Sequence, residues 1–278
     1  MPSQSVRPAA VAGTWYPGRP DRIAAEVESY LGTVGPRTVA GRLVALVSPH
    51  AGLRYSGPVA AYGYSLLRGR SDLTAVLVGP SHHVAFDGVS VWGKGAFETP
   101  LGLAPVDEPL VARLMAADPR IVDVPSLHRD EHSLEMQLPF LQHLVPGLKI
   151  VPVLMGSQSR GEVEALSRAL ASALAGSEAL LVASSDLSHY HPAPVANRLD
   201  AFVVGNVESF DADGLMKRLE ESHEHACGGG PIVAVMKAAQ ALGATRATIL
   251  KYADSGDAGE HDKSRVVGYL SAALTAPA

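Results

Sequence analysis

The stretch Leu43-Val44-Ala45-Leu46-Val47-Ser48-Pro49-His50-Ala51-Gly52 carries the pattern that decides the fold. Its first five residues form an apolar run typical of a strand buried on both faces. A histidine and two small residues follow where this strand would end. Four more apolar runs have the same character, namely Ala75–Val78, Ile150–Leu154, Ala179–Ala183 and Ala247–Leu250.

Segments with helical periodicity lie between these runs. Start signals support two of them, with Asp107 before Glu108 and Ser133 before Leu134. The alternation predicts a single three-layer α/β/α domain over residues 1–278, with a mostly parallel or mixed central sheet. The predicted helices are Asp21–Leu31, Val59–Leu67, Glu108–Ala117, Leu134–His143, Glu162–Ala175, Val195–Val207, Asp213–Glu221 and Ile232–Leu242; Val266–Leu274 fits either a strand or a short helix.

The composition is that of a globular protein, with 47% hydrophobic and 18% charged residues in 278. A net charge of −5 without a basic stripe argues against a nucleic-acid partner. The N-terminus has no apolar core of signal-peptide length, and no stretch reaches the ~18 apolar residues of a membrane span. The single cysteine excludes an intrachain disulfide. We therefore expect a cytoplasmic protein without a membrane partner.

Histidines follow several of the predicted strands. His50, His82 and the pair Asp186 and His189 lie just beyond strand ends, where ligands bind in open α/β sheets. The only cysteine, Cys227, lies in a glycine-rich step from His223 to Pro231. Imidazole and thiolate are the side chains that hold transition metals, so the sequence predicts a metal pocket.

Each of these residues also has a structural interpretation. His50 taken alone is better explained by a hydrogen bond within its loop. Because the side chains of neighbouring His82 and His83 must diverge, we favour His82 for the pocket and a supporting role for His83. Asp186, three residues before His189, either shares the pocket or caps a helix, and His189 suits a general acid or base.

Cys227 precedes Gly228–Gly230 and a helix expected to start near Pro231. The helix dipole there would favour the thiolate and hence metal ligation or nucleophilic reactivity. The alternative is a small buried hydrophobe. Spacing also allows His132 and Glu135 to share a face toward the pocket. Two loop aromatics, Trp15 and Tyr55, either wall that pocket or serve packing.

Taken together, the motifs resemble the Memo family, also known as component B of the AmmeMemoRadiSam system. The resemblance runs in order over nearly the whole chain. Its motifs are Arg7-Pro8 with Ala12-Gly13-Thr14-Trp15-Tyr16-Pro17, Pro49-His50-Ala51-Gly52 with Tyr55-Ser56-Gly57, Gly79-Pro80-Ser81-His82-His83, Glu131-His132-Ser133-Leu134-Glu135 with Leu138-Pro139-Phe140, Ser184-Ser185-Asp186-Leu187-Ser188-His189, Cys227-Gly228 with Pro231, and Tyr252-Ala253 with Ser255.

The resemblance implies a fold similar to the LigB-type class III extradiol dioxygenases. It implies His50, His82 and Cys227 as ligands of one transition-metal ion, iron or copper, with zinc as a further candidate. Asp186 and His189 would line the same pocket as catalytic residues. AMMECR-type and radical-SAM proteins of the same system are the implied protein partners.

The sulfur ligand separates this pocket from the two-histidine, one-carboxylate site of the dioxygenases. Thiolate shifts metal preference toward copper, zinc or thiolate-bound iron, and Asp186 is an alternative carboxylate ligand. The leading hypothesis is redox or dioxygenase-like chemistry on an unknown small substrate. The alternatives are a non-catalytic module that binds a peptide or protein in this pocket, and a metal-dependent hydrolase with His189 as base.

Overall fold

The apolar runs form one large mixed sheet. The computed structural model describes residues 6–222, 224–258 and 262–278. All five expected strands are present, as β2 (Arg42–Ser48), β3 (Thr74–Pro80), β8 (Lys149–Met155), β9 (Leu180–Ser184) and β11 (Arg246–Asp254). The sheet order is β10-β12-β2-β9-β3-β8-β4-β7, with β11 paired to β12. The strands not yet bounded are β4 (Val89–Val91), β7 (Ile121–Asp123), β10 (His189–His191) and β12 (Val266–Ala276).

The centre of the sheet is parallel and is flanked by antiparallel pairs, and β7 at one end is again parallel to β4. Strands β2, β9, β3 and β8 run parallel, and β12 and β4 pair antiparallel to β2 and β8 at either side. The run Val266–Leu274 is therefore a strand, because β12 has β2 on one edge and β11 on the other. Strand β11 differs from the expectation of full burial. It is half-buried because it lies at the edge of the sheet.

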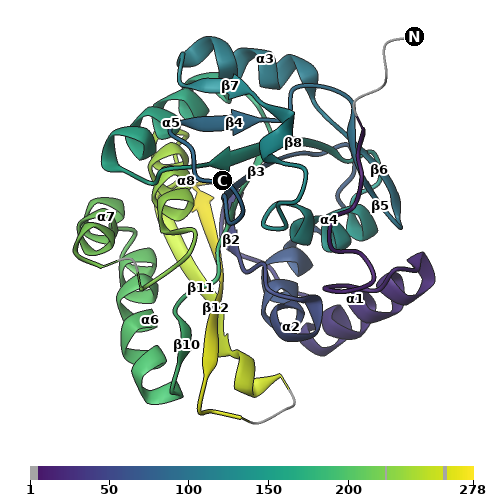
Figure 1. Ribbon diagram of the computed structural model, residues 1–278, viewed down its shortest axis with the longest axis vertical. Helices are drawn as coiled ribbons and strands as arrows, with labels where there is room; N and C mark the ends of the chain where they lie inside the picture. Colours follow the sequence, from purple (N-terminus) through teal and green to yellow (C-terminus); the bar gives the residue numbers. More distant parts are fainter. Residues whose placement is uncertain (1–5, 223, 259–261) are drawn as a thin grey trace.

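Helices cover both faces of this sheet, which confirms the three-layer α/β/α architecture (Figure 1). Helix α8 packs on β2, β3 and β9 and contacts α5, whereas α2 packs on β2, β11 and β12. The helices are α1 (Pro20–Val34), α2 (Leu53–Tyr64), α3 (Glu108–Ala117), α4 (Leu138–Leu144), α5 (Arg160–Ala173), α6 (Ala193–Glu208), α7 (Ala212–Glu221) and α8 (Gly229–Ala241). The 3-10 turns are η1 (Ser65–Leu67), η2 (Pro125–Leu127), η3 (Glu135–Gln137) and η4 (Ser255–Asp257).

A second, small sheet lies beside the large one and was not expected from the sequence. It joins β1 (Val6–Arg7), β5 (Ala96–Thr99) and β6 (Gly102–Pro105) in the order β1-β5-β6. These strands are two to four residues long and mostly lack an apolar run. Their pairing carries the N-terminal segment back across the molecule, toward the loops that follow the parallel strands.

One of the two expected helix caps is present. The side chain of Asp107 accepts a hydrogen bond from the amide of Leu110 at 3.1 Å and caps α3. Ser133, in contrast, does not cap a helix, which corrects the prediction. Its hydroxyl donates to the carbonyl of Pro80 at the end of β3, and the chain enters η3 only at Glu135.

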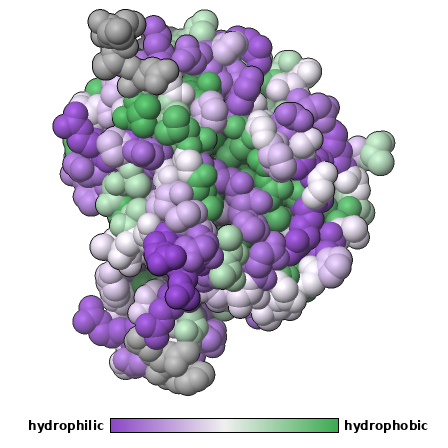
Figure 2. Space-filling model, turned by 90° about the vertical axis from the view of Figure 1, so that its right-hand side faces the viewer, coloured by the Kyte–Doolittle hydropathy of each residue, from purple (hydrophilic) through white to green (hydrophobic). Residues whose placement is uncertain are grey.

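The surface carries both hydrophilic and hydrophobic residues. On the face shown in Figure 2, hydrophilic residues predominate and hydrophobic ones gather mainly in the upper half. Several large apolar side chains are exposed, among them Trp15 and Tyr190. No helix in the described part of the chain has the length and apolar character needed to cross a membrane.

Candidate functional site

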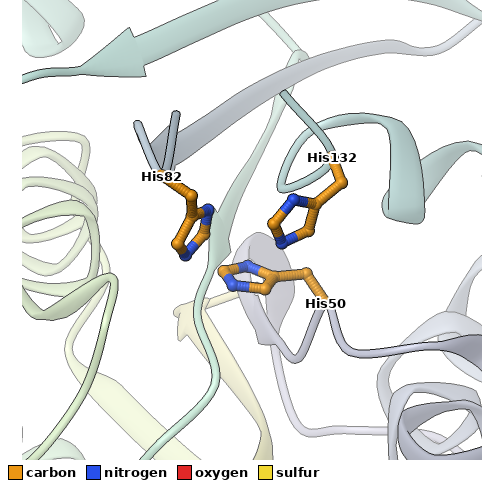
Figure 3. A group of neighbouring side chains, drawn as sticks. All are labelled: His50, His82 and His132. Atoms are coloured by element: carbon orange, nitrogen blue, oxygen red, sulfur yellow. The ribbon is translucent and has the colours of Figure 1, made fainter. Parts of the chain in front are cut away.

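Three histidines from separate loops converge at the carboxyl ends of the parallel strands. His50 follows β2, His82 follows β3, and His132 lies between η2 and η3. One ring nitrogen from each lies within 4.8 Å of the others, and the three rings face a common space (Figure 3). Burial lowers the pKa of His50 well below its usual range and that of His132 to about 4. Both are therefore neutral near pH 7, the form in which imidazole binds metals.

The hydrogen bonds around His50 fix its tautomer. Its Nδ1 lies 2.8 Å from the hydroxyl of Ser184, and that hydroxyl donates its own proton to the carbonyl of Ser133 at 2.6 Å. Gln137 Nε2 also donates to the Ser184 hydroxyl, at 2.8 Å. Because the hydroxyl proton is already used, His50 must be the donor at Nδ1. Its Nε2 therefore presents a lone pair to the shared space.

Glu131 fixes the tautomer of His82 in the same way. Nδ1 of His82 lies 2.9 Å from Glu131 Oε1, and this carboxylate also accepts the backbone amides of His82, His132 and Ser133. Burial alone would raise the pKa of Glu131, but the bonds from His82 and the amides outweigh it and hold the pKa below its usual range. An ionised carboxylate can only accept, so the proton is on Nδ1 and the Nε2 lone pair is free.

The only thiol of the chain adjoins this histidine set. Cys227 Sγ lies 3.2 Å from His50 Nε2 and 3.6 Å from the carbonyl oxygen of Asp186. Among the described residues, the potential ligand atoms that all lie within 4.8 Å of one another are the three histidine nitrogens. The sulfur contacts one of these histidines, His50. His50 and His82, which were expected as ligands, thus lie together with the Cys227 sulfur and with His132, which was expected only to line the pocket.

The environment of Cys227 differs from the one expected at the start of a helix. Burial raises the pKa of the thiol above its usual range, and Asp186 acts in the same direction. The first amides of α8 have other partners, since Gly228 donates to the Ser185 hydroxyl and Gly230 to the Gln158 side chain. The expectation that the helix start favours the thiolate is therefore wrong for the metal-free chain, because desolvation outweighs the dipole.

Asp186 is turned toward the backbone of the His50 loop. Its Oδ1 accepts the amides of His50 at 2.7 Å and Ala51 at 3.2 Å. Burial raises the pKa of Asp186 to about 7 in spite of these bonds. The residue does not cap a helix, because the chain continues from Leu187 into the short strand β10. In this position it holds the loop that presents the His50 ring.

His189 begins strand β10 and pairs with Val267 of β12. Burial lowers the pKa of this imidazole below its ordinary value, and nearby His82 adds to the effect. A neutral imidazole near pH 7 can accept a proton from a bound molecule. Asp186 and His189 both follow β9, with Asp186 in the connection and His189 at the start of β10.

The two aromatics singled out in the sequence lie beside the histidines. The ring of Trp15 is 4.2 Å from that of His132, and Trp15 and Tyr55 both line a cavity of about 450 Å³. A second cavity, of about 590 Å³, is lined in part by Cys227. His83 is exposed, and its ring stands edge-on to His132 at 5.8 Å.

Glu135 does not face the pocket with His132. Its buried carboxylate pairs with Arg7 at 2.6 Å, accepts the Tyr16 hydroxyl at 2.7 Å and accepts two backbone amides of the N-terminal segment. The i, i+3 spacing was misleading because η3 begins only at Glu135, so the two residues do not share a helical face. Glu135 instead holds the loop that carries Trp15.

Two residues that shape the site received no role from the sequence. Glu131 and Ser184 each bond a histidine that is distant along the chain, 49 and 134 positions away. A carboxylate directly before His132 and a serine at the end of a strand were visible signals. Neither signal indicated the partner, because only the folded chain brings the end of β9 beside the loop after β2, and the segment before η3 beside the loop after β3.

Comparison with known proteins agrees with these observations. A family model described as Memo-like protein matches residues 7–273. A MEMO1 family protein of Methanothermobacter thermautotrophicus is 35% identical, over 95% of this chain and 98% of its own. A MEMO1 family protein of Methanocaldococcus jannaschii is 38% identical, over 96% and 98%.

The fold also resembles a solved structure. The crystal structure of an uncharacterized protein of Escherichia coli K12 matches with a TM-score of 0.57, covering 82% of this chain and 99% of that one. At 17% identity this likeness concerns the fold alone. The family match spans nearly the whole chain and includes every loop of the histidine site, so this chain belongs to the Memo family.

Proposed function

We propose that this chain is a cytoplasmic protein that binds one transition-metal ion and uses it for redox chemistry on a small substrate. The proposed ligands are His50, His82 and Cys227, with His132 as the neighbouring donor. One observation carries the proposal: Ser184 and Glu131 fix both tautomers so that two Nε2 lone pairs face the same space. Lone pairs gathered in this way are stabilised when a cation is bound between them.

The donor set limits the choice of metal. Two imidazoles with a thiolate suit copper, zinc or iron rather than magnesium or calcium. Iron or copper is proposed because a bound redox metal supplies electron transfer to or from the substrate. Ligation requires Cys227 to lose its thiol proton, so metal uptake should release protons.

The residues around the metal position have distinct proposed roles. Asp186 holds the His50 loop through two amide bonds, which keeps the His50 ring in place. His189 is the proposed acid or base, since burial keeps it neutral. His50 is buried and His82 is exposed, so a substrate could approach the metal position from the His82 side.

Metal analysis of protein purified without chelators tests the proposal. We expect close to one iron or copper per chain, and loss of that metal in the double variant His50→Gln, His82→Gln. Single variants Cys227→Ser and His132→Gln identify the third donor, because only removal of a true ligand should weaken binding strongly. Unchanged metal content in the double variant would refute a site between these histidines.

Turnover separates the enzyme from a binding module that uses the same pocket. Protein loaded anaerobically with Fe(II) should consume oxygen in the presence of a catechol-like compound. His189→Gln should slow this consumption at unchanged metal content. Lack of turnover with bound metal, together with saturable peptide binding, would favour the non-catalytic alternative.

A further inference from the structure

A cavity beside the histidines has an unusual lining. Aromatic residues make up only 5% of the chain, yet four of them line this space of about 450 Å³. Its size falls in the range of sites for small molecules. Its lining residues are Thr14, Trp15, Ala51, Gly52, Tyr55, Tyr190, Ser255, Arg265, Val267 and Tyr269.

The cavity lies next to the candidate metal centre. Ala51 follows His50 in the chain, and the ring of Trp15 contacts that of His132 at 4.2 Å. The ring of Tyr190 lies 5.7 Å from that of His189. A molecule in this space would therefore lie against residues that adjoin those proposed to hold the metal and to move a proton.

Arg265 is the one charged residue in the lining, and no aspartate or glutamate is among the described residues that form it. Its guanidinium lies 5.3 Å from the ring centre of Tyr190. No carboxylate pairs with Arg265 in the described ranges. The larger cavity near Cys227 differs, because its Arg160 is paired with Glu220 at 2.6 Å.

Two of the aromatics are exposed to solvent, and one of them also has an unfavourable backbone conformation. Tyr190 is 64% exposed and adopts a left-handed backbone with φ of 63°. This conformation costs a non-glycine residue roughly 1–2 kcal/mol. Trp15 is 38% exposed although it is large and apolar. Strained residues and exposed aromatic groups of this kind cluster at ligand sites.

We propose that this cavity binds a small anion with a flat ring. The ring lies among Trp15, Tyr55 and Tyr190, and its carboxylate or phosphate group is held by Arg265. The proposal rests on the proposed function in one respect, since it names the substrate class of the same site. Guanidinium suits either anion because its donors match two oxygens at once.

Ligand-observed NMR titration with simple probes tests this assignment. Benzoate should bind at least about 10-fold more tightly than benzamide, because only benzoate offers the anion. Phenyl phosphate in place of benzoate shows which anion is preferred. Cyclohexanecarboxylate keeps the charge but not the flat ring, so it should bind more weakly than benzoate.

Variants locate the binding. Arg265→Gln should weaken benzoate about 10-fold and leave benzamide unchanged. Arg37→Gln is the matched control, because Arg37 also lies over a tyrosine ring, that of Tyr62, outside the cavity. Equal affinity for benzoate and benzamide, absence of saturable benzoate binding, or unaltered benzoate affinity in Arg265→Gln would each overturn the proposal.

Metal content of the same samples keeps the two proposals apart. Benzoate binding is measured on metal-free and metal-loaded protein, and Arg265→Gln should retain the full metal content. Protein that binds benzoate through Arg265 but never binds metal would refute the metal proposal and leave the anion site standing. Protein that binds metal but not benzoate would refute the anion site and leave the metal proposal standing.

Discussion

Two polar clusters lie close together in this molecule and differ in one respect. In the anchor cluster, formed by Arg7, Tyr16 and Glu135, the guanidinium donates to Glu135 and to backbone carbonyls, and Glu135 accepts the Tyr16 hydroxyl and two amides. In the histidine cluster, formed by His50, His82 and His132, ring nitrogens face one another instead. A cluster whose donors and acceptors are all paired with one another has a structural role, whereas nitrogen lone pairs that converge on one space indicate a bound ligand.

Hydrogen bonds and a ring contact also connect the two clusters. Arg7 donates to the backbone carbonyl of Glu131, whose side chain holds His82. Glu135 holds the N-terminal loop, whose Trp15 ring contacts His132. The anchor cluster therefore fixes both the loop that orients His82 and the aromatic that covers His132.

The largest effect is expected from breaking the anchor cluster. Arg7→Met should lower the free energy of unfolding by about 3–5 kcal/mol, because it leaves the Glu135 carboxylate buried without its cation. Urea denaturation measures the loss. The double variant Arg7→Met, Glu135→Gln should lose less than the sum of the single changes. Additive losses would show that the two groups are not coupled.

The sequence predicted the fold well because apolar runs report burial on both faces. Residues such as Leu43–Val47 and Ile150–Leu154 lie in the parallel centre of the sheet. Helices cover both faces there, so polar and apolar residues do not alternate along these strands. The short strand Val89–Val91 was missed because three residues do not establish a period. Val266–Leu274 stayed ambiguous because neighbours on both edges, rather than local pattern, make it a strand.

The sequence pointed to the three converging histidines, but not to the contacts that hold them. Strand ends identified His50 and His82 because topology alone brings such residues to one edge. The partner of His82 is Glu131, a contact between two loops that no local pattern reports. Spacing assigned Glu135 to the pocket, but the charge of Arg7 draws that carboxylate to the anchor cluster.

The second effect concerns the hydrogen bond that orients His82. Glu131→Gln should weaken metal binding about 10–100-fold, since the amide nitrogen can donate to Nδ1 and shift the proton to Nε2. Competition with a colorimetric chelator measures the affinity. Glu28→Gln is the matched control, because Glu28 bonds His143 at 2.8 Å on the surface. Equal affinities for the two variants would remove Glu131 from the metal centre.

A third effect comes from His128, whose carbonyl accepts a hydrogen bond from Arg7. Burial, followed by the charge of Arg7, lowers the pKa of His128 from 6.5 to about 3. Above pH 6.5 the group is neutral in the folded and unfolded states and contributes nothing. Below pH 6.5 the unfolded chain takes up a proton that the folded chain cannot, so stability falls by about 1.4 kcal/mol per pH unit.

Comparison of the wild type with His128→Gln isolates this contribution. Between pH 7 and pH 5 the wild type should lose about 2 kcal/mol more than the variant, as read from urea midpoints at each pH. The difference should vanish above pH 7. Parallel pH profiles for the two proteins would show that His128 titrates normally in the folded chain.

The smallest effect tests whether the backbone beside the histidine cluster is strained at Tyr190. Tyr190, next to His189, has φ of 63°, which glycine adopts without cost and alanine does not. Tyr190→Gly should therefore be about 1 kcal/mol more stable than Tyr190→Ala, whereas both lose the ring that lines the cavity. Thermal denaturation compares the two variants. If alanine proves as stable as glycine, Tyr190 carries no strain, and its exposure alone would have to support a role in ligand binding.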